Sequence, residues 1–210
     1  MPKIIPQSAE LLSATPEAEK LIELAGRTCY ASEDKITEAS AAKFVKMICS
    51  RKHVSVIEHA YATIKFTTCR GITHEAVRHR ISSFSQSSTR FIDSTKKGGM
   101  EVIEPLGMNE VQHALWWKSM CDSEEAYFAL RAAGAPPEVA RDVLPNSFAT
   151  RIVWSANLRS WSHVMALRYH GEAGKPHPLI KQLMSMALPL LLGVAPTVFA
   201  PKESEGIERG

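Results

Sequence analysis

The residues best suited to chemistry gather in one stretch of the chain, from Arg70 to Arg90. This stretch contains four arginines, two histidines, many Ser and Thr hydroxyls and a single acid, Glu75, so four positive charges against one negative give +3. The whole chain carries the same formal charge of +3. Arginine offers a planar fork of N–H donors that matches phosphate or carboxylate, and hydroxyls add short hydrogen bonds. The stretch therefore predicts a site for an anion.

Arg78, His79 and Arg80 are consecutive, and the surrounding pattern predicts a short helix over 72–81. On a helix three successive side chains fan through about 200°, so they cannot all face solvent. An inward-pointing arginine needs a partner, because an unpaired buried charge is costly. We therefore expect a bound anion or a carboxylate beside this triplet.

Two other interpretations of the stretch are a solvated helix face and a nucleic-acid-binding module in which segment 70–90 grips RNA or DNA. Nucleic-acid binding usually interleaves basic residues with aromatic ones, on which bases stack. Phe84 is the only aromatic residue between Arg70 and Arg90. The nucleic-acid interpretation is therefore the weaker one.

Common metal and nucleotide-loop motifs are absent from the sequence. His74 and His79 are five residues apart, whereas the helical zinc motif needs a spacing of four to place both rings on one side. The four cysteines form no Cys-x-x-Cys pair, and no G-x-G-x-x-G or G-x-S-x-G pattern occurs. The sequence predicts no metal site.

A second polar cluster occupies 157–168, where Asn157, Arg159, His163 and Arg168 are interleaved with apolar residues. The pattern predicts an amphipathic helix over 157–169, whose polar side faces either solvent or a ligand. Arg141, shortly before it, is either a surface arginine or a second contact for an anion.

The elements that must position these residues are expected to form one α+β domain. The chain has 210 residues, 45% hydrophobic and 22% charged, and no glycine- or serine-rich linker divides it. Apolar alternation and β-rich runs predict strands over 60–68 and 149–156, a short strand over 100–103, and a loop or irregular strand over 82–89. Helices are expected over 15–29, from Thr37, over 109–133 and over 178–192. The expected buried residues of the 109–133 helix include Val111, Leu115, Trp116, Cys121 and Phe128.

The two ends of the chain favour a cytoplasmic protein that does not span a membrane. The N-terminus lacks the apolar run of a signal peptide, and the apolar stretch 188–195 is too short to cross a bilayer. A single catalytic domain is expected to span 1–210, with a polar, frayed tail over about 201–210.

Arg78-His79-Arg80, followed after seven residues by Ser88, resembles the R-H-R-x7-S signature of the flavin-dependent thymidylate synthases (ThyX). Further segments similar to the family's follow the same order along the chain: H-x-S-x-x-E-H at 53–59, R-x-x-L-P at 141–145 and N-x-R-S at 157–160. Together the matches extend from about Cys49 to Phe199.

The resemblance implies reductive methylation of dUMP to dTMP, with methylenetetrahydrofolate as carbon donor, FAD as hydride carrier and NADPH as reductant of the flavin. It also implies a single domain with helices packed around a mainly antiparallel β-sheet. The family is usually a homotetramer with active sites where subunits meet. No nucleic-acid or membrane partner is expected.

The resemblance assigns three groups of site residues. Around FAD it places Ser55, Arg78, His79, Arg80, Gln86, Asn157, Arg159 and His163. Around dUMP it places Glu75, Arg78, Gln86, Ser87, Ser88, Thr89, Arg90, Arg141 and Arg168. Near the flavin and folate it places His53 and Glu58.

Arg168 is the expected principal catalytic residue, a cation beside the uracil ring that stabilises negative charge when the pyrimidine is activated. Ser88 is expected to bind phosphate rather than act as a nucleophile, because no adjacent base is evident. Four positions depart from the commonest family pattern: His163 replaces Asn, Glu75 replaces Gln, Gln86 replaces Glu, and Phe91 replaces Tyr.

Overall fold

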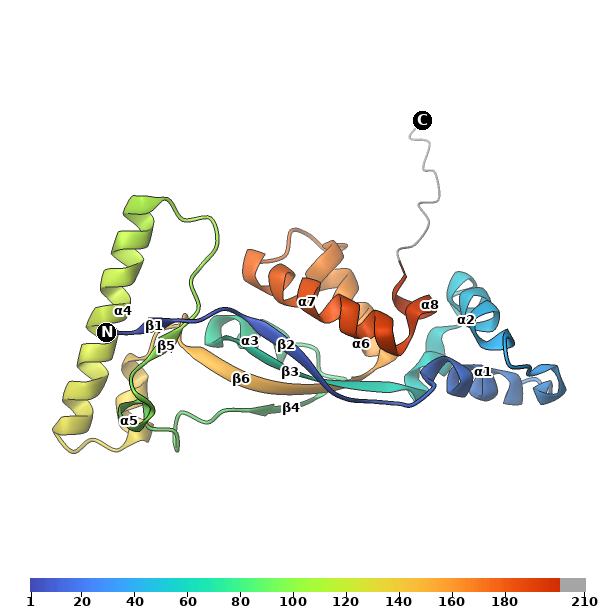
Figure 1. Cartoon of the computed structure of the whole chain (residues 1–210), viewed down its shortest axis with the longest axis horizontal. Coiled ribbons are helices and arrows are strands. Elements are labelled where there is room, and N and C mark those ends of the chain that lie inside the picture. Colours follow the sequence, from blue (N-terminus) through green and yellow to red (C-terminus); the bar gives the residue numbers. More distant parts are fainter. Residues whose placement is uncertain (201–210) are drawn as a thin grey trace.

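Four antiparallel strands form the central sheet, in the order β2-β3-β6-β4. The computed structural model shown in Figure 1 describes residues 1–200, so the predicted tail over 201–210 lies outside the described residues. The strands of the sheet are β2 (Ser8–Ala14), β3 (Tyr61–Cys69), β6 (Ala149–Asn157) and β4 (Ser83–Gln86). A short parallel pair stands apart, formed by β1 (Lys3–Ile4) and β5 (Glu101–Val102).

Strands β3 and β6 form the middle of the sheet because each has one apolar face. In β3 the side chains of Ala62, Ile64 and Phe66 are buried, and the residues between them are partly exposed, which confirms the predicted alternation. Helices α6 (Leu158–Met165) and α7 (Pro178–Val194) lie over one face of this sheet (Figure 1). The main hydrophobic core lies between that face and these helices.

The remaining helices lie around this centre. Helices α1 and α2 occupy one end of the molecule, and α4 occupies the other (Figure 1). The bounds are α1 (Ala18–Thr28), α2 (Ser40–Ser50), α3 (Arg70–Ala76), α4 (Glu110–Ala132), α5 (Pro137–Ala140) and α8 (Pro196–Phe199). Short 3₁₀ helices cover Glu33–Lys35, Val54–His59, Ser94–Lys97 and Arg141–Val143. None of the helices described is both long and apolar enough to cross a bilayer.

The N-terminal region differs from the prediction at Thr15. Helix α1 begins at Ala18, after Glu17 in a left-handed conformation with φ 48°, and not at a cap on Thr15. Thr15 instead closes the β2–β3 pair, because its Oγ1 accepts the Tyr61 N–H at 2.9 Å. Strand β2 was not predicted, since it is a largely exposed strand whose pairing shifts between Leu11 and Ser13.

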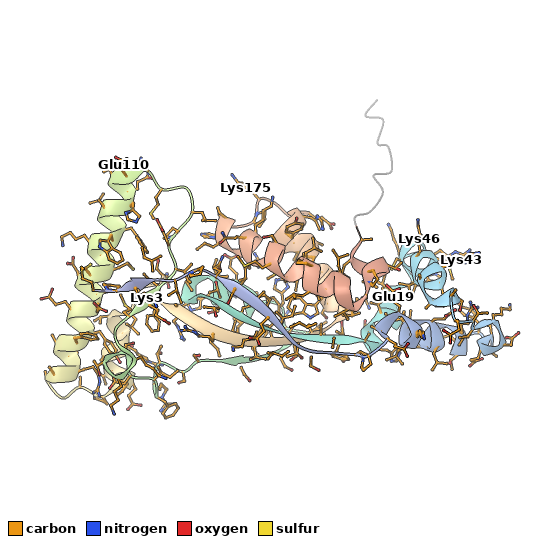
Figure 2. All side chains as sticks on the ribbon, in the orientation of Figure 1. Lys3, Glu19, Lys43, Lys46, Glu110 and Lys175 are labelled. Carbon is orange, nitrogen blue, oxygen red and sulfur yellow. The ribbon has the colours of Figure 1, made fainter. Side chains whose placement is uncertain are left out.

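Helix α1 is also fastened to the last helix of the described chain. The Glu19 carboxylate accepts the backbone N–H of Thr197 at 2.6 Å and its hydroxyl at 3.0 Å. Glu19 is labelled in Figure 2, where α1 and α8 lie next to each other. This contact joins the first helix of the chain to α8 at one end of the sheet.

Helix α4 has the predicted start but a different buried face. Asn109 and Gln112 form a reciprocal capping box, as Asn109 predicts. Val111 and Leu115, expected to be buried, are 69% and 66% exposed; Trp116, Cys121 and Phe128 are partly exposed. The buried residues are Met120, Glu124 and Tyr127.

Glu124 explains this difference in the face of α4. Its carboxylate accepts the Met100 N–H at 2.8 Å and pairs with the Met1 ammonium at 2.9 Å. A buried carboxylate is tolerated when such partners satisfy it. Apolar periodicity alone cannot identify a helix face whose burial depends on a carboxylate.

Asp93 connects the segment after Arg90 to α4. It is 8% exposed, and its Oδ2 accepts from Arg131 at 2.7 Å (Nη2) and 3.2 Å (Nε). Its Oδ1 accepts the Thr95 N–H at 3.0 Å and the Thr95 hydroxyl at 2.7 Å. The hydrogen bonds from Arg131, then those from Thr95, hold the pKa of Asp93 well below its ordinary 3.8.

Asp93→Asn is expected to make stability less dependent on acid pH. Because the folded pKa of Asp93 lies below the unfolded one, its ionised form stabilises the protein above about pH 4, and this stabilisation is lost as pH falls further. Urea midpoints between pH 3 and pH 6 check this, with Asp142→Asn as control, since the Asp142 side chain is 82% exposed. Parallel pH curves for wild type and Asp93→Asn would contradict the prediction.

Candidate active site

The triplet Arg78, His79 and Arg80 lies in a turn and not on a helix. Helix α3 ends at Ala76, earlier than the predicted 72–81, because the chain must reverse to enter β4, where Ser83 pairs with Ser155 of β6. Arg78 and Arg80 are exposed and His79 is partly buried. The three side chains therefore do not all face solvent, as expected, but the helix on which that expectation rested ends before them.

Arg168 provides the partnered arginine that the charge pattern predicts. Its Nη1 donates to Glu75 Oε2 at 2.8 Å, and its Nε donates to His79 Nε2 at 3.2 Å. The Arg168 and Glu75 side chains are 24% and 30% exposed. The two clusters found in the sequence thus meet at one ion pair, and the inward-facing arginine comes from the second cluster.

A π-helical turn carries Arg168. The predicted helix over 157–169 divides into α6 and a wider turn over Ala166–His170. The turn ends at Gly171, where φ is 78° and an added Cβ would meet Gly174 O at 3.0 Å, so this position needs glycine. Single π turns within helices are frequent at functional sites.

His79 is held in an aromatic cluster beside Arg168. Its ring centroid lies 5.6 Å from that of Trp154 and 6.0 Å from that of His163. Burial, followed by the charge of Arg168 and by His163, lowers the pKa of His79 from 6.5 to about 4. Because the Arg168 Nε–H donates to Nε2 of His79, the neutral ring carries its proton on Nδ1.

His79 of the ligand-free protein is expected to stay neutral at pH 5.5 and to titrate near pH 4. Its folded pKa lies below the unfolded one, so its stabilising contribution is present above about pH 6.5 and is lost as pH falls towards 4. An NMR titration of ring protons, with the His79 signal identified by its loss in His79→Gln, checks this. Titration of His79 near 6.5 in the folded protein, as in urea, would contradict it.

The segment after β4 contains the predicted phosphate-binding hydroxyls. Gln86 Nε2 donates to Thr73 Oγ1 at 3.0 Å and to Thr150 Oγ1 at 3.2 Å.

Beyond Gln86, Ser88 Oγ accepts the Arg90 N–H at 3.3 Å. The Ser87 N–H donates to Arg151 O at 2.9 Å, Thr89 is buried, and Arg90 contacts Glu138 at 3.4 Å. The segment is thus fixed against β6 with Arg90 near the surface.

Arg141 lies near this segment. Together with Thr89, Arg70 and His74 it lines a cavity of about 240 Å³. Arg70 was seen in the sequence only as part of the charged stretch, and no motif singled it out. Its place in the cavity depends on α3 meeting the segment that follows Arg141, where the Gly71 N–H donates to Asn146 O at 3.0 Å. Local sequence does not reveal this contact.

The N-terminus of α6 brings a third group of predicted residues together. Asn157 caps the helix, since its Oδ1 accepts the Ser160 N–H at 2.7 Å. Arg159 forms an ion pair with Glu58, which lies on the exposed 3₁₀ helix that follows His53 and carries Ser55. His163, farther along α6, joins this group to His79.

Two buried polar atoms of this region have no hydrogen-bond partner among the described residues. They are Nε1 of Trp154, a side chain only 1% exposed, and Oγ of Ser82. Neither was predicted as a site residue, because tryptophan and serine carry no recognisable spacing here. Within residues 1–200 no three His, Cys, Asp or Glu side chains are placed to hold a metal ion.

Comparison with known proteins agrees with the sequence signature. A family model described as "Thymidylate synthase complementing protein" matches residues 10–197. A flavin-dependent thymidylate synthase of Geobacter sulfurreducens is 36% identical over 197 residues, covering 90% of this chain and 84% of that protein. One of Corynebacterium glutamicum is 35% identical, covering 98% and 88%.

Solved structures share the fold at low sequence identity. A ThyX structure from Helicobacter pylori with FAD and dUMP has a TM-score of 0.77 at 22% identity, covering 93% of this chain and 98% of that one. The UMP/dUMP methylase PolB of Streptomyces cacaoi has a TM-score of 0.81 at 18% identity, covering 94% and 95%. The predicted α+β architecture with a mainly antiparallel sheet is confirmed. The chain belongs to the flavin-dependent thymidylate synthase family.

Proposed function

We propose that this protein converts dUMP to dTMP by reductive methylation, with methylenetetrahydrofolate as carbon donor, FAD as cofactor and NADPH as reductant. The observation that carries the proposal is the contact of Arg168 with Glu75 and His79. It joins the family's R-H-R turn to the π-helical turn that follows α6, the helix capped by Asn157. Family membership supports the reaction, and the H. pylori relative of this fold binds FAD and dUMP.

The dUMP site is proposed to lie between the Arg168 contact and the hydroxyl segment 86–90. Ser87, Ser88, Thr89 and Arg90 offer donors for the phosphate, with Arg141 as a further cation. Arg168 would face the uracil ring and stabilise negative charge that develops there, while Glu75 keeps its guanidinium in place. Arg78 and Gln86 complete the nucleotide site.

The residues proposed for FAD fit an anionic, aromatic group. A depression of about 650 Å³ is lined by His74, Val77, Arg78 and Arg80, and these residues include no carboxylate that would repel a pyrophosphate. His79 lies between Arg78 and Arg80 in sequence, and its ring centroid is 6.0 Å from that of His163, so both rings offer N–H groups for the flavin in this proposal. When bound, FAD supplies hydride transfer. In this proposal the flavin and the folate lie against the polar groups of Ser55, Asn157 and Arg159 and against His53 and Glu58.

The protein is further proposed to act in the cytoplasm as a homotetramer whose active sites lie between subunits. Arg78 and Arg80 project outward from the chain that carries them. Ile81, shortly before β4, and Phe91, directly after the hydroxyl segment, are 76% and 79% exposed. Apolar exposure of this kind next to a site is typical of a surface that another chain covers.

The nucleic-acid interpretation is not supported. Phe84, the one aromatic residue of the 70–90 stretch, packs with its ring centroid 5.2 Å from that of Trp154. A ring held this way is not free to stack on a base.

The purified protein is expected to be yellow and to release FAD on denaturation. With dUMP, methylenetetrahydrofolate and NADPH it should form dTMP, which chromatography detects; omission of each substrate in turn is the control. A protein that stays colourless after FAD is added, and forms no dTMP, would refute the function. Salt-sensitive binding to oligonucleotides without any response to dUMP would favour the alternative.

A further inference from the structure

A second basic segment covers 39–57, outside the stretch from Arg70 to Arg90. It comprises α2 and the turn that joins α2 to the 3₁₀ helix Val54–His59. It contains no Asp or Glu and four cations, all with exposed side chains: Lys43, Lys46, Arg51 and Lys52. Among residues 1–200 no carboxylate pairs with Arg51 or Lys52. This basic segment is therefore open to an anionic ligand.

The turn after α2 holds Lys52 in an unfavourable conformation. Its φ is 59°, in the left-handed region where glycine is at ease and a residue with a side chain is strained. The Lys52 N–H donates to Cys49 O at 3.1 Å, and the His53 N–H donates to Ile48 O at 2.9 Å, so the turn is fixed to the end of α2. Glycine is the usual residue at such a position. A lysine here indicates that its side chain has a use.

The helix dipole explains only part of this charge. A cation is favoured near the last carbonyls of a helix, which suits Arg51 and Lys52. Lys43 lies in the first turn of α2, where the dipole opposes a positive charge. Lys43 and Lys46, both labelled on α2 in Figure 2, are three residues apart and therefore neighbours on the helix surface. Cations thus follow α2 along its length, an arrangement that fits a linear ligand with several anionic groups.

One end of the basic segment adjoins residues proposed for the folate. Lys52 directly precedes His53, and the 3₁₀ helix that follows carries Glu58. Glu58 pairs with Arg159 in the first turn of α6. The turn after α2 is therefore connected to the helix that leads to the Arg168 contact.

We infer that the basic segment binds the glutamate tail of methylenetetrahydrofolate, with Arg51 and Lys52 at the first carboxylates and α2 beside those of further γ-linked glutamates. The inference rests on the proposed function and gives one of its substrates a subsite. The tail has two carboxylates in the monoglutamate and one more with each added residue. Exposed pairs of cation and carboxylate are individually weak. They add up along a tail because the pterin end of the same molecule is already held.

The phosphates of FAD and NADPH are the competing anions in the same reaction. FAD is assigned to the depression lined by Arg78 and Arg80, which lies on another part of the chain. The phosphates of NADPH form a compact group, whereas α2 has 11 residues and is about 16 Å long. The folate tail therefore fits the basic segment better, and the KM of NADPH tests the choice.

Steady-state kinetics with the mono- and triglutamate forms of methylenetetrahydrofolate test the inference. In wild type the KM of the triglutamate should be about fivefold lower, and about 0.5 M salt should remove most of this advantage. Arg51→Met combined with Lys52→Gly should reduce the advantage to less than about twofold. Its kcat should not change, because contacts made equally in the ground and transition states alter KM alone. The KM of NADPH should stay as in wild type.

Lys52→Gly alone separates binding from structure. Because glycine accepts the left-handed conformation, this variant should raise the Tm by about 2 to 4 °C, while it raises the KM of the triglutamate. Ala31→Gly is the matched control: Ala31 is exposed with φ 45°, so its variant should raise the Tm and leave every KM unchanged. Lys52→Arg keeps the charge and should keep the triglutamate advantage.

Four results would overturn the inference. They are equal KM values for the two folates in wild type, an undiminished triglutamate advantage in the double variant, a rise in the KM of NADPH in place of that of the triglutamate, and a lower Tm in Lys52→Gly. If wild type forms dTMP in these cases, the proposed function stands and only the tail subsite falls. A wild type that forms no dTMP with either folate overturns both.

Discussion

Arg168→Ala is expected to lower the rate of dTMP formation by about a thousandfold while FAD remains bound. Its side chain donates hydrogen bonds to both Glu75 and His79. Removing a positive charge placed where negative charge develops typically costs a factor of about 10² to 10³ in rate. Single-turnover kinetics at saturating dUMP, with the flavin spectrum recorded in parallel, measure both effects.

Two further variants identify the reason for the loss. Arg168→Lys retains the charge but cannot donate to Glu75 and His79 at once, so it should recover only part of the rate. Glu75→Gln keeps a hydrogen-bond acceptor for Arg168, and it should lower the rate far less than Arg168→Ala does. Turnover of Arg168→Ala equal to that of wild type would remove Arg168 from its proposed role.

Trp161→Ala is expected to destabilise the protein by about 4 kcal/mol, since removing a buried tryptophan side chain costs about 3 to 5 kcal/mol. Trp161 is fully buried in α6, and its ring centroid lies 4.7 Å from that of Trp154. Its Nε1 donates to Ala62 O of β3 at 3.0 Å. The loss therefore affects the docking of the helix that carries the site, and urea unfolding followed by circular dichroism measures it.

Trp161→Phe separates packing from the hydrogen bond. It keeps an aromatic ring and should cost clearly less than the alanine variant, with part of its cost due to the unpaired Ala62 oxygen. Trp117→Ala, at a partly exposed position of α4, is the control and should cost less than Trp161→Ala. Equal midpoints for Trp161→Ala and Trp117→Ala would contradict the prediction.

The local sequence pattern was sufficient to predict the elements whose burial or capping depends on their own side chains. Strand β3 alternates between core and solvent, and Asn109 caps α4 with its own side chain, so both could be predicted. Strand β2 and the buried face of α4 could not, because they depend on partners far away in sequence. Glu124 is buried because its carboxylate pairs with the Met1 ammonium and accepts the Met100 N–H. The residues next to Glu124 in sequence do not indicate these partners.

The site was predicted as residue types rather than as contacts. The spacing of Arg78, His79, Arg80 and Ser88 was enough to suggest the family, and the comparisons confirm the family. The ion pair between Glu75 and Arg168 was not predicted, because it requires α3 and the π-helical turn to approach each other. Arg70 was missed for the same reason, because it lines one cavity with Arg141 only when segments far apart in sequence come together.

The pairing of β3 with β6 has a consequence for the order in which the chain folds. Tyr61 pairs with Asn157, and the bond from Trp161 to Ala62 joins residues 99 positions apart. Contacts of such sequence separation form slowly, because a long loop must close before they can. A nascent chain cannot complete the middle of its sheet until β6 has left the ribosome. Arg168, which follows β6 in sequence, is therefore placed only at the end of folding.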